Sequence, residues 1–203
     1  MTLLIFDFDG TIVDSKQAYY QGMEKALSEY GFSKRSIDDA IDVGLSLSET
    51  LKKLGFSMIF RWILKRKIMK RVLAQTSQIK KCRDVDGLRS LDGEKIIISN
   101  SLSEFIIPVL KHLKLRKEFS EIYGSESFSD KAVFIKNYLT KNKINKKECF
   151  YIGDRVIDIK TARECKIKSI IISNKCSWDS KKEILRAKPD FIIKEIKEIK
   201  NIL

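Results

Sequence analysis

Four continuous apolar runs alternate with charged segments along the chain. They cover residues 2–8, 95–99, 148–153 and 169–173, and Gly10 follows the first run. Large apolar side chains dominate each run, and polar residues gather at its carboxyl end. Runs of this length and composition predict strands that are buried on both faces, as in a parallel sheet.

Segments with helical spacing separate the later runs, at residues 103–113, 131–141 and 158–165. Alternating strands and helices predict a parallel sheet with helices on both faces, a Rossmann-like α/β core. Residues 191–193 predict a last short strand, and residues 194–203 predict a terminal helix. Pro108 should kink its helix or lie in the first turn.

The stretch from 15 to 84 has a different pattern. It contains no continuous apolar run, and its hydrophobic residues recur every three or four positions, as at Met23, Leu27 and Tyr30. This spacing predicts helices. We therefore expect a small all-helical domain at 15–84, inserted after the first strand of a core formed by 1–14 and 85–203.

Charge, cysteine content and hydropathy limit the binding partners and the cellular location that we expect. The 203 residues carry a formal charge of +13, from 40 Lys and Arg against 27 Asp and Glu. Such a surface attracts phosphorylated metabolites, nucleic acid and anionic lipid alike, although lysine-rich composition can also reflect genome bias. The four cysteines have no close-spaced pair and there is one histidine, so neither a zinc site nor a disulfide framework is indicated. No run approaches the ~20 apolar residues of a membrane span and no basic leader is evident, so we expect a cytoplasmic protein.

Polar residues follow three of the predicted strands where each strand ends. They are Asp7 and Asp9, then Ser99 and Asn100, then Asp154. In open parallel sheets the ligand lies outside the carboxyl ends of the strands. The three groups are therefore expected to converge on one edge of the sheet.

The paired carboxylates Asp7 and Asp9 indicate a cation. Two residues apart on a strand, they project to the same side, where burial without compensation would be costly. Magnesium prefers such hard oxygen ligands and commonly binds a substrate phosphate as well. Asp154 can supply a third carboxylate, and backbone amides at Gly10 and Thr11, with those near Asn100, can cradle a phosphate.

Four motifs together resemble those of the haloacid dehalogenase-like hydrolase superfamily. They are Phe6-Asp7-Phe8-Asp9-Gly10-Thr11, Ile98-Ser99-Asn100-Ser101, Lys131 and Gly153-Asp154-Arg155-Val156-Ile157-Asp158. Their order and spacing fit, and the resemblance covers essentially the whole chain outside the insertion. The helical insertion itself resembles the cap of the phosphoglycolate phosphatase and β-phosphoglucomutase branch.

The resemblance implies roles for these residues. Asp7 attacks phosphorus to form an aspartyl-phosphate, and Asp9 serves as general acid and base. Asp7, Asp154 and the Asp9 backbone carbonyl hold magnesium, and Lys131 neutralises charge. Further residues would bind the phosphate or support the metal site: Gly10, Thr11, Ser99 and Asn100 for the phosphate, and Asp158 for support.

Some of these residues also have a structural interpretation. Ser99 can simply end a strand, and Asp158 can cap a helix or orient the lysine. Lys136 competes with Lys131 for the same role. The chain also departs from the common pattern, because Ala132 follows Lys131 where many relatives have proline, and Cys165-Lys166 stands where a glycine is frequent.

The implied activity is magnesium-dependent hydrolysis of a small phosphate monoester, similar to that of phosphoglycolate phosphatase. A phosphosugar mutase is the enzymatic alternative. In this branch a cap loop approaches the leaving group, which makes Ser46, Ser48 and Glu49 candidate specificity residues. Either serine can equally be an ordinary helix N-cap.

The insertion is also strongly basic, with no acid between Glu49 and Asp84. Its segment 56–71 is basic and amphipathic, a pattern found in helices on membrane surfaces and in calmodulin targets. A packed cap helix with one buried apolar face has the same pattern. A protein that binds anionic lipid or nucleic acid, with secondary phosphatase activity, is therefore an alternative of another class. The oligomeric state is left open.

Overall fold

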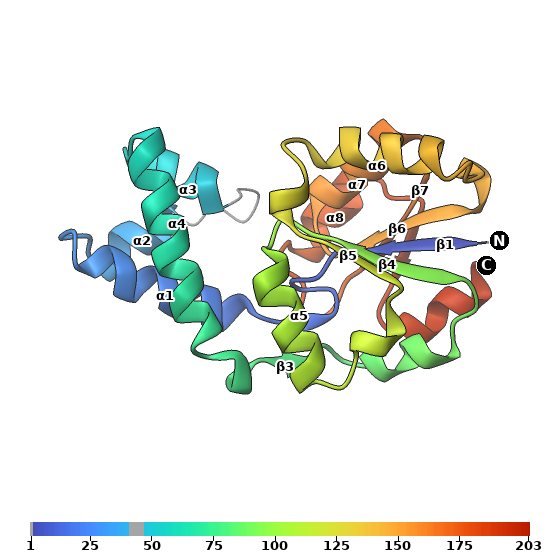
Figure 1. Ribbon diagram of the computed structural model, residues 1–203, viewed down its shortest axis with the longest axis horizontal. Helices are drawn as coiled ribbons and strands as arrows, with labels where there is room; N and C mark the ends of the chain where they lie inside the picture. The colour runs from blue at the N-terminus through green and yellow to red at the C-terminus, as the bar shows by residue number, and fades with distance from the viewer. Residues whose placement is uncertain (1, 41–46) are drawn as a thin grey trace. The chain divides into compact units, whose positions relative to one another are not determined.

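The computed structural model describes residues 2–40 and 47–203, with the side chains of 38 and 48 left out. The chain divides into two compact units, of which the first is Met1–Asp14 with Lys80–Leu203 and the second is Ser15–Ile79 (Figure 1). Residues 80–84, which the sequence assigned to the insertion, belong to the first unit. The reason is that β3 (Lys80–Lys81) pairs antiparallel with β2 (Val13–Asp14) where the chain leaves the core and returns to it.

A six-stranded parallel sheet forms the centre of the first unit. The strand order is β5-β4-β1-β6-β7-β8. The strands are β1 (Leu3–Phe6), β4 (Glu94–Ile98), β5 (Glu121–Tyr123), β6 (Cys149–Gly153), β7 (Lys168–Ile172) and β8 (Phe191–Ile193). The predicted α/β fold with a parallel sheet is confirmed.

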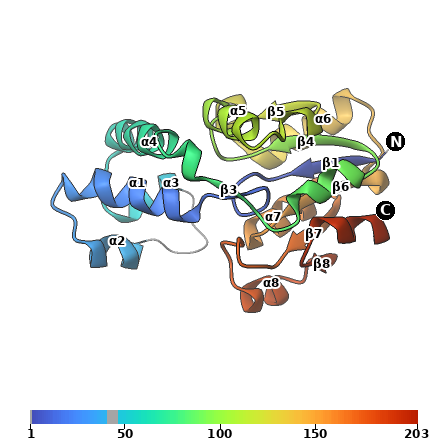
Figure 2. The same ribbon diagram turned by 90° about the horizontal axis from the view of Figure 1, so that it is seen from below.

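Helices cover both faces of this sheet (Figure 2). The side chains of β1 alternate between the two faces and pack against the helices on each. Leu3 and Ile5 point to one face, where they pack in a buried cluster with residues of α6 (Lys131–Lys141) and α7 (Val156–Cys165). On the other face, Phe8, just beyond the strand, makes an edge-on ring contact with Phe105 of α5 (Ser103–His112).

The remaining elements of the first unit are α8 and short 3₁₀ helices. They are η2 (Val85–Ser90), η3 (Arg116–Glu118), η4 (Ser125–Ser127), η5 (Lys146–Glu148), α8 (Lys181–Ala187) and η6 (Ile196–Asn201). The predicted terminal helix at 194–203 is the shorter η6. Pro108 lies inside α5, beyond its first turn.

The second unit is entirely helical in its described part. Its elements are α1 (Lys16–Ser28), α2 (Lys34–Ala40), α3 (Leu47–Lys53), α4 (Met58–Leu73) and η1 (Thr76–Gln78). Helices α1 and α4 pack closely at Gly22, where an added Cβ would lie 2.9 Å from Cγ2 of Val72. Ser57 caps α4 by accepting a hydrogen bond from the Phe60 N–H.

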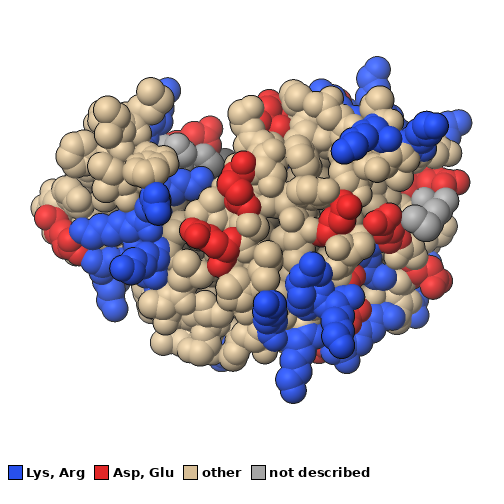
Figure 3. All heavy atoms as spheres, in the orientation of Figure 1, with Lys and Arg blue, Asp and Glu red and all other residues tan. Residues whose placement is uncertain are grey.

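Lys and Arg side chains occur in several groups over both units rather than in one place (Figure 3). Within residues 2–40 and 47–203, no helix has both the length and the apolar composition needed to cross a bilayer.

Candidate active site

Three neighbouring strands bring the predicted polar groups to one edge. Strand β1 lies between β4 and β6, so Asp7, Ser99 and Asp154 all follow the carboxyl ends of adjacent parallel strands. The Asp7 N–H donates to the Ile152 carbonyl at 2.8 Å, which extends the β1–β6 pairing to Asp7 itself. This backbone hydrogen bond therefore holds the Cα of Asp7 in place at the end of β1.

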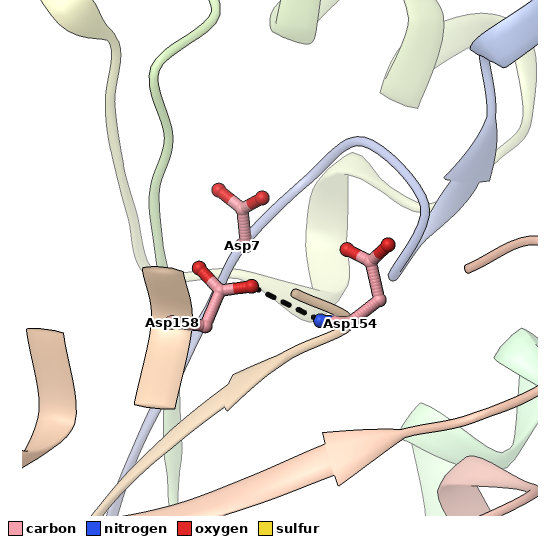
Figure 4. A group of neighbouring side chains, drawn as sticks. All are labelled: Asp7, Asp154 and Asp158. Carbon is pink, nitrogen blue, oxygen red and sulfur yellow. Dashed lines mark hydrogen bonds between the residues drawn. The ribbon is translucent and has the colours of Figure 1, made fainter. Parts of the chain in front are cut away.

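Asp7, Asp154 and Asp158 form a cluster of buried carboxylates (Figure 4). One oxygen from each lies within 4.8 Å of the others. The three residues are 8%, 0% and 1% exposed. Three negative charges this close in a buried position are unfavourable without a compensating cation. Oxygen donors in this arrangement are the kind that hold a divalent cation.

The Asp154 carboxylate accepts hydrogen bonds from two other loops. Its Oδ1 accepts from the Thr11 hydroxyl at 3.1 Å, and its Oδ2 accepts from the Trp178 N–H at 2.6 Å. Burial, together with the charge of Asp158, raises the pKa of the Asp154 carboxyl well above its usual value. A bound cation would favour the charged form and reverse this effect.

Gly10 is required where the chain turns beneath Asp154. Its φ is +75°, and an added Cβ would lie 2.3 Å from Oδ2 of Asp154 and 2.5 Å from Cδ1 of Trp178. Only glycine provides both this backbone conformation and this space. The turn thus lets Thr11 reach Asp154.

Asp158 has two tasks. Its Oδ2 accepts the Asp154 N–H at 3.1 Å (Figure 4). The same oxygen accepts the Arg155 N–H at 2.9 Å, and the two bonds close the turn from β6 into α7. Burial, with the charge of Asp7, raises the pKa of the Asp158 carboxyl to about 7. Asp158 is therefore both a cap of α7 and a member of the carboxylate cluster.

Lys131 reaches this cluster from the first position of α6. Its Nζ lies 3.1 Å from Oδ1 of Asp7 and 2.8 Å from the hydroxyl of Tyr151. Asp130 caps the same helix by accepting from the Val133 N–H at 2.8 Å. Of the two lysines considered from sequence, Lys131 is the one that the described contacts join to Asp7.

Asp9 and the residues after β4 form a second polar group. The half-buried Asp9 accepts a hydrogen bond at Oδ2 from the Ser101 hydroxyl. Ser99 is buried, and its Oγ accepts from the Ser101 N–H at 3.2 Å, whereas Asn100 is exposed. The Asp9 side chain is not part of the carboxylate cluster. Its predicted metal contact is through the backbone carbonyl.

Four residues at this edge were not among the site residues that the sequence identified: Ser101, Tyr151, Trp178 and Asp179. Asp179 accepts from the Val156 N–H at 2.7 Å and from Nε of Arg155 at 3.3 Å, so it holds the start of α7. Trp178 and Asp179 follow β7, which neighbours β6. That adjacency was the available signal, because every loop after a parallel strand reaches the same edge.

The three proposed specificity residues lie in the second unit. Ser46 is outside the described residues, and Ser48 is described only as part of the α3 backbone. Glu49 is exposed in the first turn of α3.

The sheet and this edge define a class: an α/β protein with a buried acidic centre and an attached lysine at the carboxyl ends of its strands. A family model described as haloacid dehalogenase-like hydrolase matches residues 4–172. The chain belongs to this family. The predicted superfamily, its phosphoglycolate phosphatase-like branch and the enzyme class are confirmed.

Curated relatives include two bacterial proteins named phosphoglycolate phosphatase. The one from Aquifex aeolicus is 24% identical, with 84% of each chain covered. The one from Aliivibrio fischeri is 22% identical over 99% of this chain and 96% of the relative.

Solved structures share the fold. A haloacid dehalogenase-like hydrolase from Streptococcus pneumoniae superposes with a TM-score of 0.84 at 21% identity, covering 100% of this chain and 98% of that one. A predicted phosphatase from Clostridium acetobutylicum gives a TM-score of 0.83 at 20% identity, with 99% and 97% covered.

Proposed function

We propose that this protein hydrolyses a small phosphate monoester through a phosphorylated aspartate at Asp7. One observation carries the proposal: Asp7 lies in a buried carboxylate cluster and is bound by Lys131. A carboxylate held this way is oriented as a nucleophile and is charge-balanced from one side. The family's hydrolase activity and the curated relatives support this choice of reaction.

In the first step an Asp7 oxygen attacks phosphorus, and the bond from phosphorus to the substrate oxygen breaks. Asp9 donates a proton to that leaving oxygen. In the second step Asp9 takes a proton from water, whose oxygen attacks the phosphoryl group and releases Asp7 and inorganic phosphate. Lys131 offsets negative charge in both steps. The Ser101 hydroxyl, which donates to Asp9, would keep the Asp9 carboxylate oriented from the first step to the second.

The donor set fits magnesium. Three buried carboxylates need a cation, and hard oxygen donors are what magnesium prefers. Asp7, Asp154 and the Asp9 backbone carbonyl would hold it, with Asp158 supporting the site. When bound, magnesium supplies positive charge that stabilises the transferring phosphoryl group.

The phosphate would lie against the turn after β1 and the loop after β4. Ser99 Oγ accepts from the Ser101 N–H, so its own O–H remains to be donated to a phosphate oxygen. The Thr11 hydroxyl is already donated to Asp154, so Thr11 would contribute its backbone amide, as would Gly10. Asn100 is exposed and would contact the phosphate from the solvent side.

The unit Ser15–Ile79 would serve as the cap that selects the leaving group. Glu49, in the first turn of α3, is its described candidate for substrate contact. The relatives named phosphoglycolate phosphatase support a small substrate of this kind.

The test is release of inorganic phosphate from a generic aryl phosphate with magnesium. We expect activity that Asp7→Asn and Asp9→Asn each reduce at least about 1000-fold, because each removes a group that the chemistry requires. Asp92→Asn is the matched control, since Asp92 is an exposed carboxylate. Full activity of Asp7→Asn, or of the wild type in EDTA, would refute the mechanism.

A screen of phosphorylated metabolites, including phosphoglycolate, then identifies the substrate by kcat/KM. Conversion of a hexose 1-phosphate to its 6-phosphate, with no phosphate release from any monoester, would establish the mutase instead.

A further inference from the structure

Helix α4 exposes large apolar side chains at its amino-terminal end. Met58, Ile59 and Trp62 are 76%, 73% and 62% exposed, and Phe60 and Ile63 are exposed as well. Single exposed hydrophobic residues need no explanation. Four of them, however, lie together within six consecutive positions: Met58, Ile59, Trp62 and Ile63. Phe60 is turned to another side of the helix, where its ring makes an edge-on contact with Tyr30. An exposed apolar group of this size is of the kind that marks an interaction site.

This surface is not the packing face of the helix. Leu64, Ile68 and Val72 are buried, and α4 packs on α1 (Figure 2). Successive residues of a helix are turned by about 100°. Ile59 and Trp62 therefore project from the side roughly opposite to Leu64 and Ile68. The sequence allowed a packed helix with one apolar face, but the structure has apolar residues on both faces here.

Basic residues continue the same side of the helix. Arg66 and Lys70 are exposed one and two turns after Trp62, and the Arg66 guanidinium lies 4.9 Å from the centre of the Trp62 ring. Lys67 and Arg71, on the flank towards α1, pair with Glu29. No acid occurs between Glu49 and Asp84, so nothing on α4 itself opposes this charge.

We propose that this α4 outer face, defined as Met58, Ile59, Trp62, Ile63, Arg66 and Lys70, docks the protein on an anionic lipid bilayer. The apolar side chains enter the headgroup boundary, where tryptophan is favoured, and the two basic side chains contact lipid phosphates. Charge attraction and apolar insertion act together, as in interfacial helices.

Two other occupants fit the face less well. In a two-fold symmetric dimer of this face, Arg66 and Lys70 would be buried with no acid on either copy of α4 to pair with them. Nucleic acid would satisfy Arg66 and Lys70 but would leave Met58 and Ile59 exposed to water. Of these three occupants, the anionic bilayer alone offers both phosphates for the basic side chains and an apolar layer for Met58 and Ile59.

The test is co-sedimentation of the full chain with vesicles of equal parts phosphatidylglycerol and phosphatidylcholine, compared with phosphatidylcholine alone. We expect at least about tenfold tighter binding to the anionic vesicles. Trp62→Ser/Ile63→Ser and Arg66→Glu/Lys70→Glu should each weaken it by about tenfold or more. The matched control, Lys182→Glu/Leu185→Ser on α8, alters an exposed basic and an exposed apolar residue and should bind as wild type.

Several results would overturn the proposal. These are equal binding to both vesicle types, wild-type binding by either α4 variant, binding to a random oligonucleotide but not to vesicles, and a stable dimer that either α4 variant dissociates. Asp7→Asn should bind vesicles like the wild type, because docking does not depend on the proposed reaction. Circular dichroism of the variants checks that loss of binding is not loss of folding.

Discussion

Lys131 is held between two oxygen atoms, the Asp7 carboxylate and the Tyr151 hydroxyl. Tyr151 is fully buried on β6, and burial, with the charge of Asp7, raises the pKa of its phenol well above the usual value. The phenol therefore stays protonated and accepts the ammonium N–H while its own O–H points to the Ile98 carbonyl, 3.4 Å away. Tyr151 is thus a positioning residue for Lys131.

Removing this hydroxyl should impair catalysis more than folding. We expect Tyr151→Phe to lower kcat about tenfold with little change in KM, because a hydrogen bond to a charged group contributes roughly 1.5–3 kcal/mol. In a Lys131→Ala background the same change should add no further loss.

Tyr123→Phe is the control for this prediction. The Tyr123 hydroxyl donates to Glu121 at 2.7 Å, so the variant loses a comparable bond without touching Lys131. An equal fall in kcat for both variants would show that the effect is structural.

Gly10 allows a direct comparison with Gly31. Both have positive φ, +75° and +81°, but an added Cβ at Gly31 meets nothing within 4 Å, whereas at Gly10 it meets Asp154 and Trp178. We expect Gly31→Ala to cost about 1 kcal/mol from backbone strain alone and Gly10→Ala to cost at least ~2 kcal/mol more. Urea denaturation measures both, and equal losses would contradict the crowding at Gly10.

Helix α7 and strand β8 show how carboxylates hold elements of the first unit in place. Asp158 and Asp179 accept N–H groups at the start of α7, where the helix dipole also favours negative charge. Asp190, just before β8, accepts at Oδ2 from the Ser169 N–H at 2.8 Å and hydroxyl at 2.7 Å, which fastens β8 to β7.

The Ser169–Asp190 contact should make stability depend on pH. Burial disfavours charge on Asp190, but the two hydrogen bonds from Ser169 outweigh it and lower the pKa of the carboxyl below its usual value. A lowered pKa means stability that is present above the unfolded-state pKa of ~3.9 and lost as the pH falls through the folded-state value. Asp190→Asn should therefore destabilise the protein at about pH 7 and much less at about pH 2.

Chemical denaturation at these two pH values checks the sign. Asp92→Asn, which also replaces a carboxylate but at an exposed position, is the control and should not reproduce this pH-dependent loss. The same destabilisation by Asp190→Asn at both pH values would contradict the prediction.

Metal binding is expected to stabilise the first unit, because the proposed ligands come from loops after β1 and β6. Asp7 and Asp154 repel one another in the folded state and are far apart in an unfolded chain. A ligand at 100 times its Kd adds about 2.7 kcal/mol of stability. Magnesium should therefore raise the melting temperature of the wild type by several degrees and EDTA should reverse the rise.

Asp154→Asn separates this effect from general salt stabilisation. The variant removes one proposed ligand and should lose most of the magnesium-dependent shift, whereas Asp92→Asn should keep it. A shift of equal size in Asp154→Asn would contradict the assigned metal site. Sodium chloride at matched ionic strength excludes screening of the chain's excess positive charge as the cause.

The sequence by itself determined the strands of the sheet centre and the family, because short segments of contiguous residues carry the signal for both. Runs such as 95–99 and 169–173 are apolar enough to specify buried strands, and the motifs around Asp7 and Asp154 need no distant partner to be recognised. The short strand β5 escaped prediction because its three half-buried residues at the sheet edge carry little apolar signal.

Only the tertiary structure decided which hydrogen bonds hold the side chains at the sheet edge. The resemblance indicated Lys131 among many lysines, but the Asp130 cap of α6 and the Tyr151 phenol are the contacts that position it at Asp7. Contacts of this kind join residues far apart in the chain, so their formation depends on strand order and not on local pattern. The same holds for α4, whose outward apolar face was indistinguishable from a packing face until its neighbours were placed.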